Sequence, residues 1–148
     1  MSRFLYPPFP TNPGDGLDTT YAVQGGTLGT QPTFSGAPLF VASYVKVGDT
    51  VTFHVNVAMT NITNFGSGQY YVTLPYDSKY TMFVRDGHLH DQSTGREFSV
   101  SGHVTAGSNQ LLLYCTGSNG HEEAFTSSVP FNLATADVFH IAGTYISE

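Results

Sequence analysis

The chain has 148 residues, enough for one domain with a buried core, and charged residues make up only 11% of it. The formal net charge is −6, and the few Lys and Arg residues are spread singly along the chain, which argues against a nucleic-acid-binding surface. The apolar runs are too short to span a bilayer, so no membrane insertion is expected.

The N-terminal quarter is rich in proline, glycine and aromatic residues. Prolines are concentrated before residue 39, and each one disfavours a helical conformation for the residue that precedes it. We therefore divide the chain into an extended docking arm, residues 1–37, and a β-sandwich domain, residues 38–148. The arm begins with side chains that we expect to bury against another protein: Phe4, Leu5, Tyr6, Pro7, Pro8 and Phe9.

Residues 50–60 alternate between apolar and polar side chains, which predicts a strand with one buried face. The buried face is expected to carry Val51, Phe53, Val55, Val57 and Met59. The opposite face is expected to carry Thr52, His54, Asn56, Ala58 and Thr60. Gly48-Asp49 predicts a tight hairpin turn that joins this strand to a strand over residues 39–47.

Further strands are expected within residues 66–76, 79–87, 89–104, 109–115 and 137–147. Asp86-Gly87 and Ser93-Thr94-Gly95 are interpreted as turns between them. No long segment has apolar residues at helical spacing. The sequence therefore predicts an all-β fold, an antiparallel β-sandwich of jelly-roll type, whose last strand is central or lies in a subunit contact.

The segment from Tyr44 to Pro75 carries a resemblance to a known group of proteins. A Tyr-hydrophobic-x-hydrophobic-Gly entry (residues 44–48) leads to the alternating strand, then to Gly66-Ser67-Gly68 and a short strand that ends in Leu-Pro. Together with "RDGHLHD", "SGHV" and "ATADVFHIAGTYI", this order resembles minor tail and head-decoration jelly-roll proteins of tailed bacteriophages, over residues 25–148. Folds of that family are similar to the trimeric C1q- and TNF-like jelly rolls.

The resemblance implies a structural component of the virion, usually a homotrimer, that is attached through its N-terminal segment. Its partners are then copies of itself and other phage structural proteins. We expect a minor tail protein; the alternatives are a capsid decoration protein and a receptor-binding module for a host-surface glycan.

Histidines and tyrosines are the candidate ligand-binding residues. His88 and His90 share a face if they lie on a strand, and with His103 or Asp91 they are weak candidates for a metal site. The alternative is that they are ordinary polar positions of a hairpin. Four tyrosines are candidates for stacking on sugar rings, although alternation also favours core or interface positions for them: Tyr70, Tyr71, Tyr76 and Tyr80.

No pattern in the sequence indicates catalysis. The acidic residues are scattered, and there is neither a nucleophile elbow nor a phosphate-binding loop with its lysine. Cys115 is the only cysteine, and its position in "LLLYC" predicts a buried thiol. We therefore expect a binding protein without a cofactor and without enzymatic activity.

Overall fold

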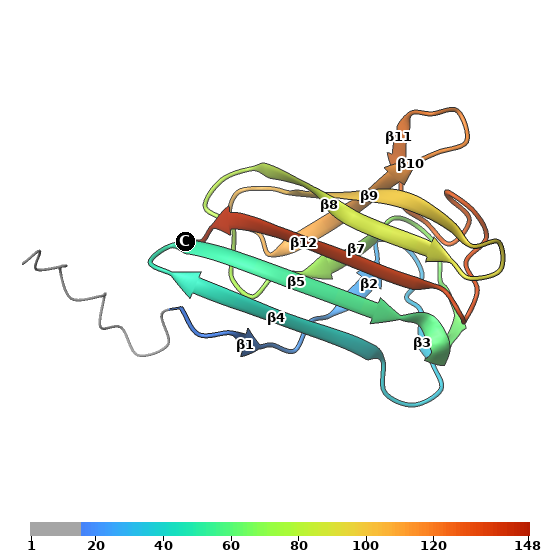
Figure 1. Ribbon diagram of the computed structural model, residues 1–148, viewed down its shortest axis with the longest axis horizontal. Coiled ribbons are helices and arrows are strands. Elements are labelled where there is room, and N and C mark those ends of the chain that lie inside the picture. The colour runs from blue at the N-terminus through green and yellow to red at the C-terminus, as the bar shows by residue number, and fades with distance from the viewer. Residues whose placement is uncertain (1–15) are drawn as a thin grey trace, which may run out of the picture.

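A computed structural model describes residues 16–148, which form an all-β fold (Figure 1). Its strands are β1 (Thr19–Thr20), β2 (Gly25–Thr27), β3 (Thr33–Phe34), β4 (Leu39–Val47), β5 (Thr50–Ala58), β6 (Ile62–Asn64), β7 (Tyr70–Thr73), β8 (Met82–Asp91), β9 (Arg96–Val104), β10 (Gln110–Thr116), β11 (Glu122–Ala124) and β12 (Val138–Ile146). A short 3₁₀ turn, η1, spans Met59–Asn61. Residues 16–148 include no helical segment with the length and hydropathy of a bilayer-spanning helix.

Most strands belong to one antiparallel sheet with the order β1-β4-β5-β12-β8-β9-β10-β7-β2, and β11 adds to β10. Figure 1 shows β4, β5, β12 and β8 in one layer, with β7 and β2 behind them. The predicted all-β, antiparallel sandwich is confirmed, and β12 is central as expected, between β5 and β8. Jelly-roll connectivity stays a prediction.

The segment between β1 and β2 ties the two ends of this long sheet together. Tyr21 donates its N–H to the carbonyl oxygen of Ala42 on β4, at 3.2 Å, and its hydroxyl to the carbonyl oxygen of Thr73 on β7, at 3.0 Å. The Gln24 N–H donates a hydrogen bond to the Thr73 side-chain hydroxyl, at 2.8 Å, and the Thr73 N–H donates one to the Gln24 carbonyl oxygen, at 2.8 Å. These contacts curl the sheet so that its two halves enclose the core.

The predicted docking arm, residues 1–37, therefore divides into two parts. β1 pairs with β4, β2 pairs with β7 and β3 pairs with β6, so residues 19–34 contribute strands to the body. Residues 1–15, which contain Phe4, Leu5, Tyr6, Pro7, Pro8 and Phe9, lie outside the described residues. Gly16 donates its N–H to the carbonyl oxygen of Lys46, so the described chain starts beside the end of β4.

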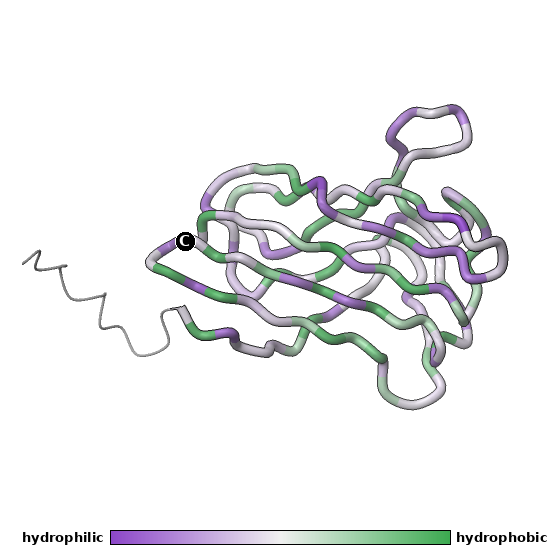
Figure 2. Tube along the Cα trace, in the orientation of Figure 1, coloured by the Kyte–Doolittle hydropathy of each residue, from purple (hydrophilic) through white to green (hydrophobic). Residues whose placement is uncertain are grey.

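The alternation predicted for residues 50–60 is confirmed. Val51, Phe53, Val55, Val57 and Met59 are all buried, and Figure 2 shows the alternation of hydropathy along the strand. The strand ends earlier than expected, because η1 turns the chain at Met59. Facing side chains of the other half of the sheet complete the core, among them Val100, Leu111, Leu113 and Cys115.

Two of the three predicted turns are confirmed. Gly48-Asp49 joins β4 to β5, where Val47 pairs with Thr50 and Gly48 has a φ of 59°. The turn at residues 93–95 joins β8 to β9, and Gly95 has a φ of 68°. Hydrogen bonds from Thr94 and Ser93 to the Asp91 carboxylate hold this turn and lower the pKa of Asp91.

The predicted turn at Asp86-Gly87 is wrong, because β8 runs through it. The pairing of β8 with β9 is irregular between Val84 and Gly87. A Cβ atom at Gly87 would lie 2.6 Å from the carbonyl oxygen of Val100. Glycine is therefore required here by the close approach of three strands, and not by a turn.

Candidate functional site: the outer face

The outward side chains of β4, β5 and β12 form one continuous surface, which we call the outer face. Residues that pair directly in an antiparallel sheet point to the same side, so the register defines the members of this surface. They are Leu39, Val41, Ser43, Val45, Val47, Thr50, Thr52, His54, Asn56, Ala58, Val138, His140, Ala142, Thr144 and Ile146.

The outer face carries no Asp, Glu, Lys or Arg. Several of its apolar side chains are open to solvent: the exposed fraction is 66% for Val41, 50% for Val47 and 45% for Leu39. A sheet face that is exposed, uncharged and partly apolar is typical of a surface that packs against another protein. The opposite, inward side chains of β4 and β5 already fill the core, so the outer face is free to serve as an interface.

Three histidines lie in a row across the middle of this surface. His54 comes from β5 and His140 from β12, and His88 follows on the neighbouring strand β8. The ring centroids are 6.3 Å apart for His54 and His140, and 5.1 Å apart for His140 and His88. His140 pairs directly with His88 in the register. We call these three residues the histidine row.

The structure separates the histidines that the sequence grouped together. His90 shares the face of His88, but its Nδ1 atom lies 2.6 Å from the Glu97 carboxylate. His103 lies on β9, where its ring stacks on Phe83 at 4.6 Å. Residues 16–148 contain no group of three or more His, Cys, Asp or Glu side chains that could hold a metal ion.

The four candidate tyrosines do not converge on one groove. Tyr70 points inward, donates its hydroxyl to the Phe65 carbonyl oxygen and has its pKa raised by burial. Tyr71 lies with its hydroxyl against Gly26 of β2. Tyr80 is 58% exposed, and the Lys79 ammonium lies 5.8 Å from its ring centroid.

Tyr76 lines an open polar groove, between the β1–β4 edge and the end of β7. The groove has a volume of about 400 Å³, and Asn109, Gln24 and Tyr44 also line it. The Tyr44 and Tyr76 hydroxyls are 3.0 Å apart, and Lys46 lies 4.2 Å above the Tyr76 ring. Both aromatic side chains are thus already engaged within the protein, which leaves less ring surface for a sugar.

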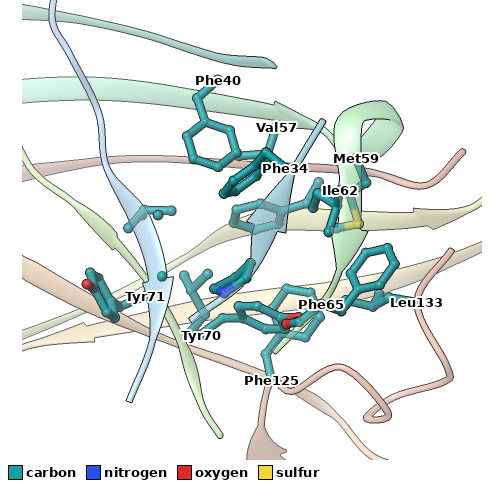
Figure 3. Close-up of a pocket in the computed structure, with 16 residues that line it drawn as sticks. Phe34, Phe40, Val57, Met59, Ile62, Phe65, Tyr70, Tyr71, Phe125 and Leu133 are labelled. Atoms are coloured by element: carbon teal, nitrogen blue, oxygen red, sulfur yellow. The ribbon is translucent and has the colours of Figure 1, made fainter. Parts of the chain in front are cut away.

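An apolar cavity of about 50 Å³ lies between the two halves of the sheet, near η1 (Figure 3). Phe34 and Phe40 line it on one side, and Phe65 and Phe125 line the other. No charged residue lines it. A cavity of this size and polarity lacks the polar groups that orient a specific ligand, so it is a gap in the packing of the core.

The remaining chemical candidate is Cys115, which is buried as predicted, with an exposed fraction of 1%. Burial, assisted by the negative charges of Glu123 and Glu122, raises the pKa of its thiol to about 12. A thiol in this state is neither a nucleophile nor a metal ligand at neutral pH. It packs in the core as a small apolar group.

The sequence pattern did not identify His54 and His140 as partners of His88. His54 was placed correctly on the outward face of its strand, since it alternates with buried residues, whereas the pattern at His140 indicated a strand without showing which face is outward. What the pattern lacks is the order of the strands, because β5, β8 and β12 are far apart in the chain. The signal available in the sequence was that a long alternating strand, β5, carries a histidine on its outward face.

No protein-family model, curated protein or solved structure matches this chain.

Proposed function

We propose that the protein is a structural component of a bacteriophage particle, a minor tail protein that assembles as a homotrimer and is attached through its N-terminal arm. The observation that carries this proposal is the outer face, which is exposed, uncharged and partly apolar over three strands. The phage assignment is supported by the sequence resemblance over residues 25–148.

The partner of the outer face is a second copy of the chain. An uncharged surface in which Val41, Val47 and Leu39 are exposed gains free energy by burial at about 25 cal/mol per Å² of apolar area. It offers no charges that select an oppositely charged partner. In a closed ring of three copies, one part of the outer face of each chain packs against a different part of the outer face of the next chain, and such closed symmetric assemblies are the usual form of soluble oligomers.

The arm has a separate role in this proposal. Aromatic and proline residues at positions 4–9 supply apolar area with little conformational freedom to lose on binding. Three arms on one trimer would also raise the overall affinity for a tail or capsid partner through multivalency.

Cryo-electron microscopy of particles tests this proposal. Particles assembled with the unchanged chain are expected to show three-lobed density in which the outer faces meet. Particles assembled with a chain that lacks residues 1–15, or with Phe4→Ser, Tyr6→Ser and Phe9→Ser together, are expected to lose that density. Density on the head would favour the capsid decoration alternative, and its absence from both particles would contradict a structural role.

A host-glycan receptor-binding module is the second candidate, and the polar groove beside Tyr76 is the observation that favours it. In that case the purified chain should retain a glycan array signal that Tyr76→Ala abolishes and Tyr80→Ala leaves unchanged. If both variants kept the glycan array signal, the groove beside Tyr76 would be ruled out as the glycan-binding site.

A further inference from the structure

The histidine row places three titratable side chains close together. The rings of His54, His140 and His88 follow one another across β5, β12 and β8, with centroid separations of 6.3 Å and 5.1 Å. His54 and His88 are exposed in the single chain, and His140 is half-buried between them. The row therefore crosses a surface whose own residues include no Asp, Glu, Lys or Arg.

The direct neighbours of the row in the sheet are uncharged. Ser43 of β4 and Ala142 of β12 pair with His54, one from each side. Ser99 of β9 pairs with His88. Charged and other titratable side chains of the surrounding strands stand farther along the register; they are Lys46 on β4, Arg85, Asp86, His90 and Asp91 on β8, and Arg96, Glu97 and His103 on β9.

Few negative charges are available to balance a protonated row. Among residues 16–148, Asp86 and Glu97 are the carboxylates nearest to the row in the register. The Glu97 carboxylate is already engaged, because it lies 2.6 Å from the Nδ1 atom of His90. Asp86 pairs with Ala142, but Arg85 beside it in the chain carries the opposite charge. Three imidazolium groups would therefore leave an excess of positive charge on this surface.

Protonation changes what the outer face can contact. Imidazole ordinarily gains its proton near pH 6.5, and it is the side chain that ordinarily titrates between pH 5 and 8. A neutral row is polar but uncharged, so it can be buried together with the apolar side chains around it. A protonated row carries like charges on adjacent rings, and burial of charges without partners is strongly unfavourable.

We propose that the histidine row makes the contact between copies sensitive to pH: the outer faces associate while the imidazoles are neutral and separate when acid protonates them. This inference rests on the proposed function, because it requires the outer face to pack against another copy. The separate chain binds protons more readily than the assembled chain. Association is therefore strongest above about pH 7 and is lost as the pH falls through about 6.5.

Multi-angle light scattering of the full chain over a dilution series, at pH 7.5 and pH 5.5, tests the inference. Ordinary Asp and Glu side chains stay ionised over this interval, so it isolates the histidines. We expect a trimer at pH 7.5 and a monomer at pH 5.5. The concentration at half-assembly should rise at least tenfold, because even one imidazole per chain that must lose its proton weakens association by about that factor.

Histidine variants identify the groups that respond. The triple variant His54→Gln, His88→Gln and His140→Gln keeps polar side chains that do not titrate, so it should remain a trimer at both pH values. His121→Gln is the matched control. His121 is exposed in the turn between β10 and β11, which projects away from β4 and β5 (Figure 1), so this variant should dissociate in acid as the unchanged chain does.

The outcomes separate this inference from the proposed function. A monomer at both pH values would contradict the proposed trimer, and the inference would fall with it. A trimer at both pH values would overturn the inference alone, as would acid dissociation that the triple variant retains. Near-ultraviolet circular dichroism should show an intact fold at pH 5.5. Loss of that signal would also overturn the inference, because acid would then act on the fold and not on the contact.

Discussion

The Tyr145 hydroxyl donates a hydrogen bond to the Tyr76 carbonyl oxygen, at 2.9 Å, and accepts one from the Tyr76 N–H, at 3.1 Å. Tyr145 is buried at the end of β12, and Tyr76 follows β7 on the other half of the sheet. This reciprocal pair therefore joins the two layers of the sandwich near the end where β4 turns into β5.

Removal of the Tyr145 hydroxyl tests the importance of this link. We expect Tyr145→Phe to lower the free energy of unfolding by about 1–2 kcal/mol, because two partly buried backbone groups of Tyr76 lose their partner. Urea denaturation measures the change. The matched control is Tyr80→Phe, since Tyr80 is 58% exposed, and its change should stay within about 0.5 kcal/mol. Equal changes in the two variants would contradict this role of Tyr145.

Gly87 tests the interpretation of β8 as a continuous strand. A Cβ atom at this position would lie 2.6 Å from the Val100 carbonyl oxygen and 3.2 Å from that of His140. Gly87→Ala is therefore expected to cost about 1–3 kcal/mol, measured by thermal or urea unfolding. Asp86→Ala, at the adjacent exposed position, should have little effect. If Asp86→Ala were the more damaging of the two, the residues would form a turn after all.

Because the Cys115 thiol is buried, we expect the folded protein to lose stability in mild alkali. Its folded pKa of about 12 lies above the usual thiol value of 9.0, so the folded state keeps the proton that the unfolded chain releases. The contribution of this group is complete below pH 9 and declines as the pH rises from 9 to 12, by up to about 1.4 kcal/mol per pH unit.

The free energy of unfolding at pH 8.5 and pH 10 checks this sign. The unchanged chain should lose stability between these values, and Cys115→Ala should lose less, since it has no thiol to titrate. A thiol reagent at pH 8 should react with Cys115 only after unfolding. Rapid reaction of the folded chain would contradict the buried position.

Local patterns predicted the parts of the fold that depend on neighbouring residues. Strand β5 (Thr50–Ala58) and the Gly48-Asp49 turn are examples, because period-two alternation and turn chemistry act over a few residues. The Asp86-Gly87 turn was wrong for a reason that lies outside the segment. Glycine is favoured both in turns and where strands approach closely. At Gly87 only the nearby Val100 carbonyl oxygen, which the sequence pattern does not reveal, distinguishes the second case from the first.

The candidate site was less accessible to sequence analysis. In residues 39–47 both faces are apolar, so the pattern could not show that Val41 is exposed while Ala42 is buried. The histidine row needs the order of β5, β12 and β8, which long-range pairing decides. Residues 19–34 have a turn-like composition, yet the structure shows that they contribute strands that pair with β4, β7 and β6. The sequence did not predict these strands, because a strand of two or three residues is too short to show a periodic pattern.

The central claim is that copies of the chain pack through the outer face, and the mass of the purified full chain in solution tests it most directly. Multi-angle light scattering should give three times the subunit mass of 16.0 kDa, and Val41→Glu should reduce this to the monomer because it buries a charge in the interface. Leu28→Glu, at a position that is 58% exposed but distant from the outer face, should remain trimeric. A monomeric unchanged chain, or a trimer that Val41→Glu leaves intact, would contradict the account.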